Sequence, residues 1–131
     1  MKIMVCYDKS PQANAALKLA IEHAKVWNAQ LLIVNSICRG LPLKHSFIKE
    51  TEQNLEDETN DLLKETSCPY ETHLLISAYD VGEQLVDFAK RNNIDQIFIG
   101  IIKKSKVGKL LFGSTAQYVI LSASCPVVTI Q

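Results

Sequence analysis

The segment from Gly100 to Ser114 reads GIIKKSKVGKLLFGS and has the residue types of an anion-binding site. Gly113 and Ser114 open a predicted helix, whose first N–H groups lack partners inside the helix and lie at the positive end of its dipole. Such an end binds phosphate readily, and a glycine lets the backbone approach the ligand closely. Four lysines add positive charge nearby: Lys103, Lys104, Lys106 and Lys109.

Simpler interpretations of the same residues remain open. Ser114 can be an ordinary helix cap and Gly113 a turn residue, because caps of this kind are common. The lysine run can be a solvated loop, as most runs of charge are. The segment is not a P-loop, since Leu110 follows Gly108-Lys109 and no upstream glycine has the required spacing.

Asp8 is the acid best placed to join such a site, because it directly follows the first predicted strand. A carboxylate at the carboxyl end of a strand can accept hydrogen bonds from ribose hydroxyls or hold a metal bound to phosphate. The alternative is a turn residue that bonds to its own backbone. No other carboxylates pair at catalytic spacing, and the sequence contains neither a metal-ligand pattern nor a Ser–His–Asp arrangement.

Hydrophobic periodicity predicts strands that alternate with helices along the chain. Short apolar runs predict five strands at 2–7, 31–37, 70–77, 95–100 and 126–130. Ser10 with Pro11, and Asp80 with Glu83, have the spacing of helix starts. We expect helices from 11 to about 27, from 47 to 66, from 81 to about 93 and from 114 to 123, with irregular connections at 39–46 and 101–112.

This order requires crossover connections, so it predicts an α/β fold: a Rossmann-like, mainly parallel five-stranded sheet with helices on both faces. Ligands of such sheets bind beyond the carboxyl ends of the strands, where the winding reverses. Three stretches should reach that edge and converge on one crevice: Asp8, Ser36–Arg39 and Gly100–Ser114.

Length and charge exclude several classes of protein. The 131 residues suit one domain, 1–131, and 47% of them are apolar. Because 14 basic residues balance 14 acidic ones, we expect neither nucleic acid nor an anionic membrane as a partner. Apolar runs are too short to cross a bilayer, and the first residues do not resemble a secretory signal. With four scattered cysteines read as reduced thiols, we expect a cytoplasmic location.

With these residues in view, the chain resembles the universal stress protein (UspA-like) family over essentially its full length. The start IMVCYDKSPQANAAL is similar, and VGEQLVDFAKRNNIDQIFIG and GSTAQYVILSASCPVVTI are more specific. The resemblance implies a sheet with the strand order 3-2-1-4-5 and homodimers that pair through the last strand. Val127–Ile130 suits that pairing, since an apolar strand at a sheet edge invites a second chain.

One branch of this family binds ATP through the motif G-x2-G-x9-G-[ST]. Placed on this chain, the motif matches at Gly100 and at Gly113-Ser114, whereas Lys103 replaces its second glycine. The resemblance implies that Asp8 contacts the ribose or a phosphate-bound metal, that Ser36 lies where the adenine meets the backbone, and that Thr115 adds a backbone N–H to the phosphate site. Lysine makes a positive φ costly, yet its ammonium can bind phosphate.

Two functions follow from the resemblance. The first is a homodimeric stress-response regulator or sensor that binds ATP or AMP, with Mg²⁺ accompanying ATP. The second is a relative that binds no nucleotide and works through dimer and protein–protein contacts, as does the branch that lacks the motif. We expect no enzyme beyond slow ATP hydrolysis, because Asp8 is the sole candidate for a general base.

Overall fold

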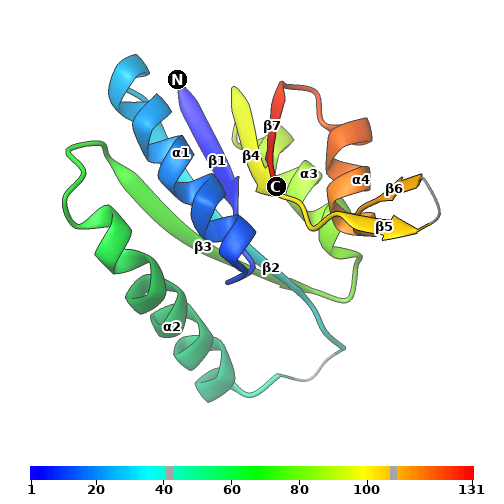
Figure 1. Ribbon diagram of the computed structural model, residues 1–131. Coiled ribbons are helices and arrows are strands. Elements are labelled where there is room, and N and C mark those ends of the chain that lie inside the picture. Colours follow the sequence, from blue (N-terminus) through cyan, green and yellow to red (C-terminus); the bar gives the residue numbers. More distant parts are fainter. Residues whose placement is uncertain (41–42, 107–108) are drawn as a thin grey trace.

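Five parallel strands form the central sheet in the order β3-β2-β1-β4-β7 (Figure 1). The computed structural model describes residues 1–40, 43–106 and 109–131, with side chains for all of these except 104–106 and 109–111. The sheet strands are β1 (Lys2–Cys6), β2 (Gln30–Cys38), β3 (Tyr70–Ser77), β4 (Gln96–Gly100) and β7 (Val127–Ile130). The helices are α1 (Pro11–Trp27), α2 (His45–Leu63), α3 (Val81–Arg91) and α4 (Ser114–Ser122). The expected strand order 3-2-1-4-5 is therefore confirmed.

The helices cover both faces of the sheet, as the alternation of strands and helices predicts. Ile3 and Val5 of β1 face one buried cluster with residues of α1 and α2. Met4 and Cys6 of the same strand face a second cluster, which contains residues of α3 and α4. Because successive side chains of a strand point to opposite faces, the central strand β1 is buried on both.

Local sequence explains where two of these helices begin. Ser10 caps α1, since its Oγ accepts a hydrogen bond from Ala13 N at 3.0 Å, and Pro11 occupies the first helical position. Asp80 caps α3 by accepting from Gly82 N at 2.9 Å. By contrast α2 runs from His45 to Leu63, two residues earlier at its start and three earlier at its end than the expected helix.

The connection expected to be irregular between β4 and α4 contains a short antiparallel pair. Its strands are β5 (Lys104–Lys106) and β6 (Lys109–Leu111), with Lys104 opposite Leu111. Strands of three residues are too short to give a detectable alternation of apolar and polar residues, which is why the sequence does not predict them. Within the described ranges, no helix combines the length and the apolar character that crossing a bilayer requires.

Candidate functional site

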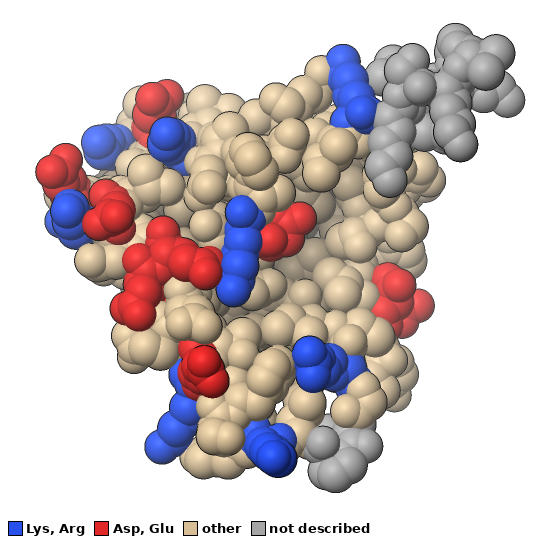
Figure 2. Space-filling model, turned by 60° about the horizontal axis from the view of Figure 1, so that its bottom comes forward, with Lys and Arg blue, Asp and Glu red and all other residues tan. Residues whose placement is uncertain are grey.

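A cavity of about 440 Å³ opens at the carboxyl edge of the sheet, between the end of β2, the turn after β1 and the start of α4. Six of the seven predicted site residues line it: Asp8, Ser36, Gly100, Gly113, Ser114 and Thr115. Charges of both signs surround this edge of the molecule, and acidic side chains gather on its α2 side (left in Figure 2). Of the three stretches expected to converge, Asp8, the first residue of Ser36–Arg39 and both ends of Gly100–Ser114 do so.

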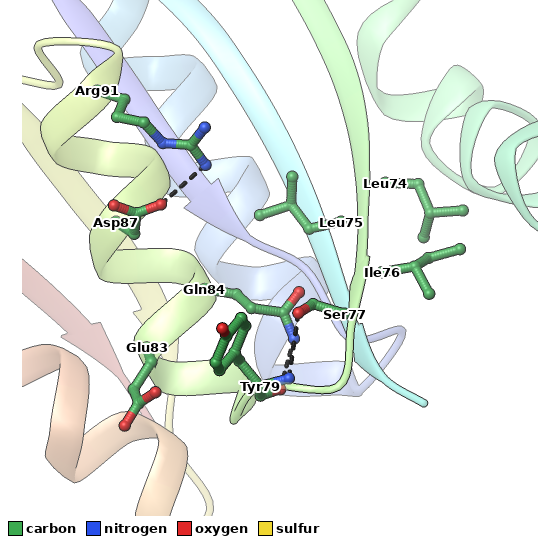
Figure 3. Close-up of a pocket in the computed structure, with 9 residues that line it drawn as sticks. All are labelled: Leu74, Leu75, Ile76, Ser77, Tyr79, Glu83, Gln84, Asp87 and Arg91. Atoms are coloured by element: carbon green, nitrogen blue, oxygen red, sulfur yellow. Dashed lines mark hydrogen bonds and ion pairs between the residues drawn. The ribbon is translucent and has the colours of Figure 1, made fainter. Parts of the chain in front are cut away.

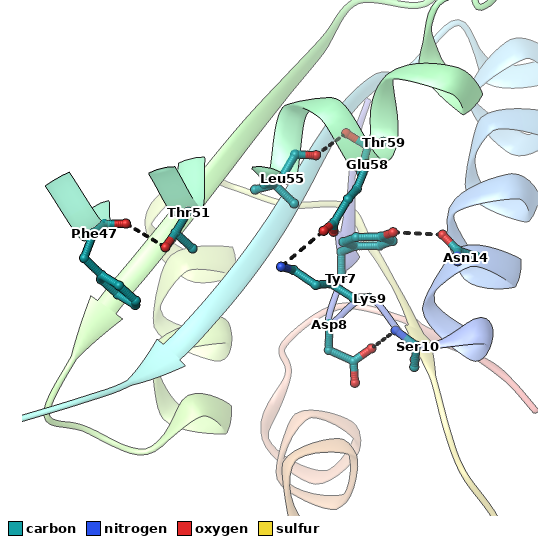
Figure 4. A network of polar contacts seen from close by, with 10 residues as sticks. All are labelled: Tyr7, Asp8, Lys9, Ser10, Asn14, Phe47, Thr51, Leu55, Glu58 and Thr59. Atoms are coloured by element: carbon teal, nitrogen blue, oxygen red, sulfur yellow. Dashed lines mark hydrogen bonds and ion pairs between the residues drawn. The ribbon is translucent and has the colours of Figure 1, made fainter. Parts of the chain in front are cut away.

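Asp8 belongs to a tight turn that leads from β1 into α1. Its Oδ1 accepts a hydrogen bond from Ser10 N at 3.0 Å, while its second oxygen points away from the turn (Figure 4). Lys9 between them has a φ of 71°, and its Nζ lies 3.2 Å from Glu58 Oε1 of α2. Asp8 thus bonds to its own backbone, as the simpler interpretation proposes, and also lines the cavity.

The turn makes a prediction about Lys9. A left-handed φ costs a non-glycine residue about 1 kcal/mol, and an ion pair as exposed as Lys9–Glu58 contributes about 0–1 kcal/mol. We expect Lys9→Gly to match the parent in urea unfolding or to exceed it by up to about 1 kcal/mol. Lys9→Ala, which loses the ion pair but keeps the backbone cost, should fall below the parent. The reverse order of the two variants would contradict this account.

The start of α4 exposes backbone donors without a side-chain cap. Gly113, with φ −58° and ψ 152°, is the N-cap, and within the described contacts no side chain completes it. Ser114 is the first helical residue, so its interpretation as the cap is wrong. A Cβ built on Gly113 would meet nothing within 4 Å, and its φ suits any residue. Neither turn geometry nor packing therefore requires glycine here.

Gly100, unlike Gly113, lies where the surrounding backbone leaves no room for a side chain. A Cβ on Gly100 would lie 2.5 Å from the carbonyl carbon of Gln12 in the first turn of α1. The end of β4 therefore approaches the α1 backbone so closely that only glycine fits. Packing alone explains this motif residue, although it also lines the cavity.

Two polar residues at the end of β2 line the cavity. Ser36 Oγ is buried and has no hydrogen-bond partner among the described atoms. Asn35 is only 7% exposed and lines the same cavity, yet the sequence analysis did not single it out. The available signal was a single amide inside the apolar run LLIVN. The unpartnered Ser36 hydroxyl is thus a hydrogen-bonding group available at the wall of the cavity.

Lys103 is the predicted site residue that the structure places elsewhere. Its side chain is exposed and is not among the described residues that line the cavity. The lysine that replaces the second motif glycine therefore leaves the cavity open. The side chains of Lys104, Lys106 and Lys109 lie outside the part of the chain that the structure describes.

Burial controls the ionisation of two groups beside Asp8. Burial, followed by the charge of Asp8, raises the pKa of the Cys6 thiol to about 12. Burial, followed by the charges of Glu58 and Asp8, raises the pKa of Tyr7, whose hydroxyl donates to Asn14 Oδ1 at 2.9 Å. Both groups are therefore neutral at physiological pH, and Asp8 is the only acid among the described residues that line the cavity.

The raised pKa of the Cys6 thiol predicts that the folded protein loses stability at alkaline pH. Below pH 9 the folded and unfolded chains both keep the Cys6 proton, so Cys6 adds no pH dependence. Between pH 9 and about 12 only the unfolded chain releases it, and the free energy of unfolding falls by up to about 1.4 kcal/mol per pH unit. We expect urea unfolding of Cys6→Ala to show a shallower fall from pH 9 to 11. If the free energy of unfolding falls equally steeply with pH in the parent and in Cys6→Ala, Cys6 is not the cause of the fall.

In the described ranges no three His, Cys, Asp or Glu side chains cluster as metal ligands do.

A larger cavity, of about 660 Å³, lies between β3 and α3 and contains none of the predicted site residues. Volume alone would favour it. We assign the site to the smaller cavity because that one lies beyond the carboxyl ends of β1 and β4, where the winding of the sheet reverses, and gathers convergent polar groups.

Comparisons with known proteins agree with this architecture. The model of the Universal stress protein family matches residues 1–131. A universal stress protein of Archaeoglobus fulgidus superposes with a TM-score of 0.81 at 34% identity, covering 100% of this chain and 93% of that one. A structure of the universal stress protein from the same organism in complex with dAMP gives 0.78 at 31% identity, covering 100% and 98%. A universal stress protein of Mycolicibacterium smegmatis is 28% identical, covering 98% of this chain and 96% of its own length. On fold, site and similarity together, the chain belongs to the universal stress protein family.

Proposed function

We propose that the cavity binds an adenine nucleotide and that the protein is a nucleotide-sensing regulator of the stress response. The observation that carries the proposal is the uncapped start of α4 at Gly113, which opens into the same cavity as Asp8 and Ser36. The cavity volume of about 440 Å³ lies within the range of about 300–1,000 Å³ typical of small-ligand sites. The relative that is complexed with dAMP and 31% identical supports this ligand class.

The proposed pose follows from which polar groups face the cavity. The phosphates bind the free N–H groups of Ser114 and Thr115, where the helix dipole favours negative charge. The ribose hydroxyls donate to the oxygen of Asp8 that the turn leaves available. The base lies against the end of β2 near Ser36, between the apolar walls of the cavity. Lys103, exposed outside the cavity, approaches the distal phosphates of ATP, and Mg²⁺ would accompany that ligand with Asp8.

Regulation rather than turnover is the proposed role. Family members are generally regulators, and the cavity offers one carboxylate, Asp8, as a possible general base. Hydrolysis of ATP, if measured, should be slow because no second acid or base lies near it in the described part of the site. The proposed active form is a homodimer in which β7, at one edge of the sheet, pairs with its copy under two-fold symmetry.

Calorimetric titration of the purified protein with AMP, dAMP, and ATP with or without Mg²⁺ tests the proposal. CMP serves as the matched control, since it carries the same phosphate and ribose but a smaller base. We expect saturable binding of the adenine nucleotides and weaker binding of CMP. If no adenine nucleotide binds at millimolar concentration, the proposal fails and the nucleotide-independent alternative stands. Sedimentation velocity at micromolar concentration checks the dimer, and a monomer there would contradict it.

A further inference from the structure

The sheet has a second open edge, on β3. Among the described strands β3 pairs with β2 alone. Leu31 N donates to Pro69 O and Arg39 N donates to Ser77 O, both at 2.9 Å, so the odd-numbered residues of this stretch direct their backbone groups toward β2. Since these directions alternate along a strand, Leu74 and Ile76 direct their N–H and C=O groups outward. The open edge therefore presents a ladder of donors and acceptors at hydrogen-bonding spacing.

A groove follows this edge on the α3 side. The cavity of about 660 Å³ lies there and is lined by Leu74, Leu75, Ile76, Ser77, Tyr79, Glu83, Gln84, Asp87 and Arg91, which we call the β3 groove. Figure 3 shows Leu75 between β3 and α3, whereas the side chains of Leu74 and Ile76 point to the opposite side. Leu75 is the apolar floor, and β3 offers backbone groups beside it. Gln84 Nε2 donates to Tyr79 O at 2.8 Å and closes one end.

Acidic side chains dominate the surroundings of this edge. Glu83 and Asp87 of α3 line the groove, and Arg91, the one cation among the described residues that line it, is paired with Asp87 at 2.9 Å. On the opposite side of β3, Glu56 of α2 lines a second cavity, of about 450 Å³, along the same strand. The carboxylate of Glu71, on β3 itself, is already bonded to His73 Nε2 at 2.9 Å and to Gln30 Nε2 at 3.2 Å. An occupant of the edge would therefore meet negative charge on both faces, which favours cationic side chains.

We propose that the β3 groove binds an extended cationic segment of a partner protein by strand addition. The segment's backbone pairs with the outward groups of Leu74 and Ile76, an apolar side chain rests on Leu75, and basic side chains reach Glu83 and Asp87. A second copy of this chain is a poor occupant, because antiparallel pairing of two β3 strands would bring the acids of both copies together. The proposal is independent of the nucleotide site, to which the β3 groove contributes no residue.

The first test uses fluorescence anisotropy with a labelled eight-residue peptide of repeating Lys-Thr-Val-Thr, whose lysine and valine side chains lie on the same face of an added strand. Two controls accompany it: the same peptide N-methylated at alternate residues, which cannot complete the backbone ladder, and the same peptide with glutamate in place of lysine. We expect the lysine peptide to bind at least about tenfold more tightly than either control. Equal binding of the N-methylated peptide, or of the acidic one, would overturn the proposal.

Variants of β3 separate backbone pairing from side-chain packing. Leu74→Pro removes one outward N–H, which an edge strand tolerates because the bonds to β2 come from the neighbouring residues. We expect this variant to lose peptide binding, and Leu74→Ala, which keeps the N–H, to retain it. Full binding by a folded Leu74→Pro protein would overturn strand addition. If circular dichroism shows that this variant does not fold, the N-methylated peptide decides the same question.

Charge reversal tests the acidic wall. Glu83→Lys should bind the lysine peptide at least about fivefold more weakly, whereas Glu22→Lys, on α1, which changes the net charge equally, should leave the affinity within about twofold. Equal losses of peptide affinity in the two variants would indicate that net charge alone determines binding. That result would overturn the proposed contact with the acidic side chains of α3. Sedimentation of the parent and Leu74→Pro proteins tests the competing occupant, since dissociation of a dimer by this change would identify a second copy instead.

Discussion

Gly100→Ala should destabilise the protein by about 3 kcal/mol or prevent folding, the largest stability effect expected of a single methyl group here. The added Cβ would lie 2.5 Å from the carbonyl carbon of Gln12 and 2.7 Å from its oxygen. Both are backbone atoms, so relief requires α1 or β4 to shift as a whole. Alanine is intrinsically better than glycine inside a strand by about 0.5–1 kcal/mol, so a measured loss reports the clash. Urea unfolding measures it.

Gly40→Ala is the matched control for that experiment. A Cβ on Gly40 would meet nothing within 4 Å, so this variant should stay within about 0.5 kcal/mol of the parent. If Gly100→Ala also lowers the free energy of unfolding by less than about 0.5 kcal/mol, β4 and α1 can move apart at little energetic cost. The motif glycine would then be free for a ligand role, rather than needed for packing.

Gly113→Val should weaken binding of dAMP about 100-fold while the protein still folds. The branched side chain would stand in the open space before the first N–H groups of α4, and losing two hydrogen bonds to a phosphate at about 1.5 kcal/mol each gives this factor. Stability should fall by no more than about 1 kcal/mol, since φ is −58° and only the quality of the cap changes. Calorimetric titration of both proteins measures the ratio.

Gly40→Val controls for the substitution itself, because it places the same side chain in open space outside the cavity. We expect it to bind dAMP as the parent does. Unchanged affinity in Gly113→Val would show that the phosphate lies away from the start of α4. The pose would then be wrong, even if the protein binds nucleotides elsewhere.

Local patterns predicted the parts of this fold that short-range chemistry determines. Ser10 and Pro11 identified the start of α1, and the alternation of apolar runs with helical stripes identified a parallel sheet covered on both faces. Asp8 and Gly113 were identified because strand ends and helix starts gather at one edge of such a sheet. The strand order, by contrast, came from the family resemblance.

The features that the sequence did not predict depend on contacts between distant residues. The need for glycine at position 100 comes from Gln12, which no local pattern connects to it. The cap of α4 fell one residue before the serine that a capping rule favours, because Gly113 already has the backbone geometry of a cap. The β3 groove depends on how α3 packs across the sheet. A short apolar run such as LLIS predicts a strand but does not indicate whether that strand lies at the edge of the sheet.

The position of β1 at the centre of the sheet has a consequence for synthesis on the ribosome. β1 pairs with β2 on one side and with β4 on the other, and roughly sixty residues separate the end of β2 from the end of β4. At about 5–20 residues per second, the nascent chain spends about 3–12 seconds with the most apolar strand paired on one side only. During that interval the side of β1 that later pairs with β4 is exposed. We therefore expect chaperones to bind the nascent chain most strongly before residue 100 is synthesised.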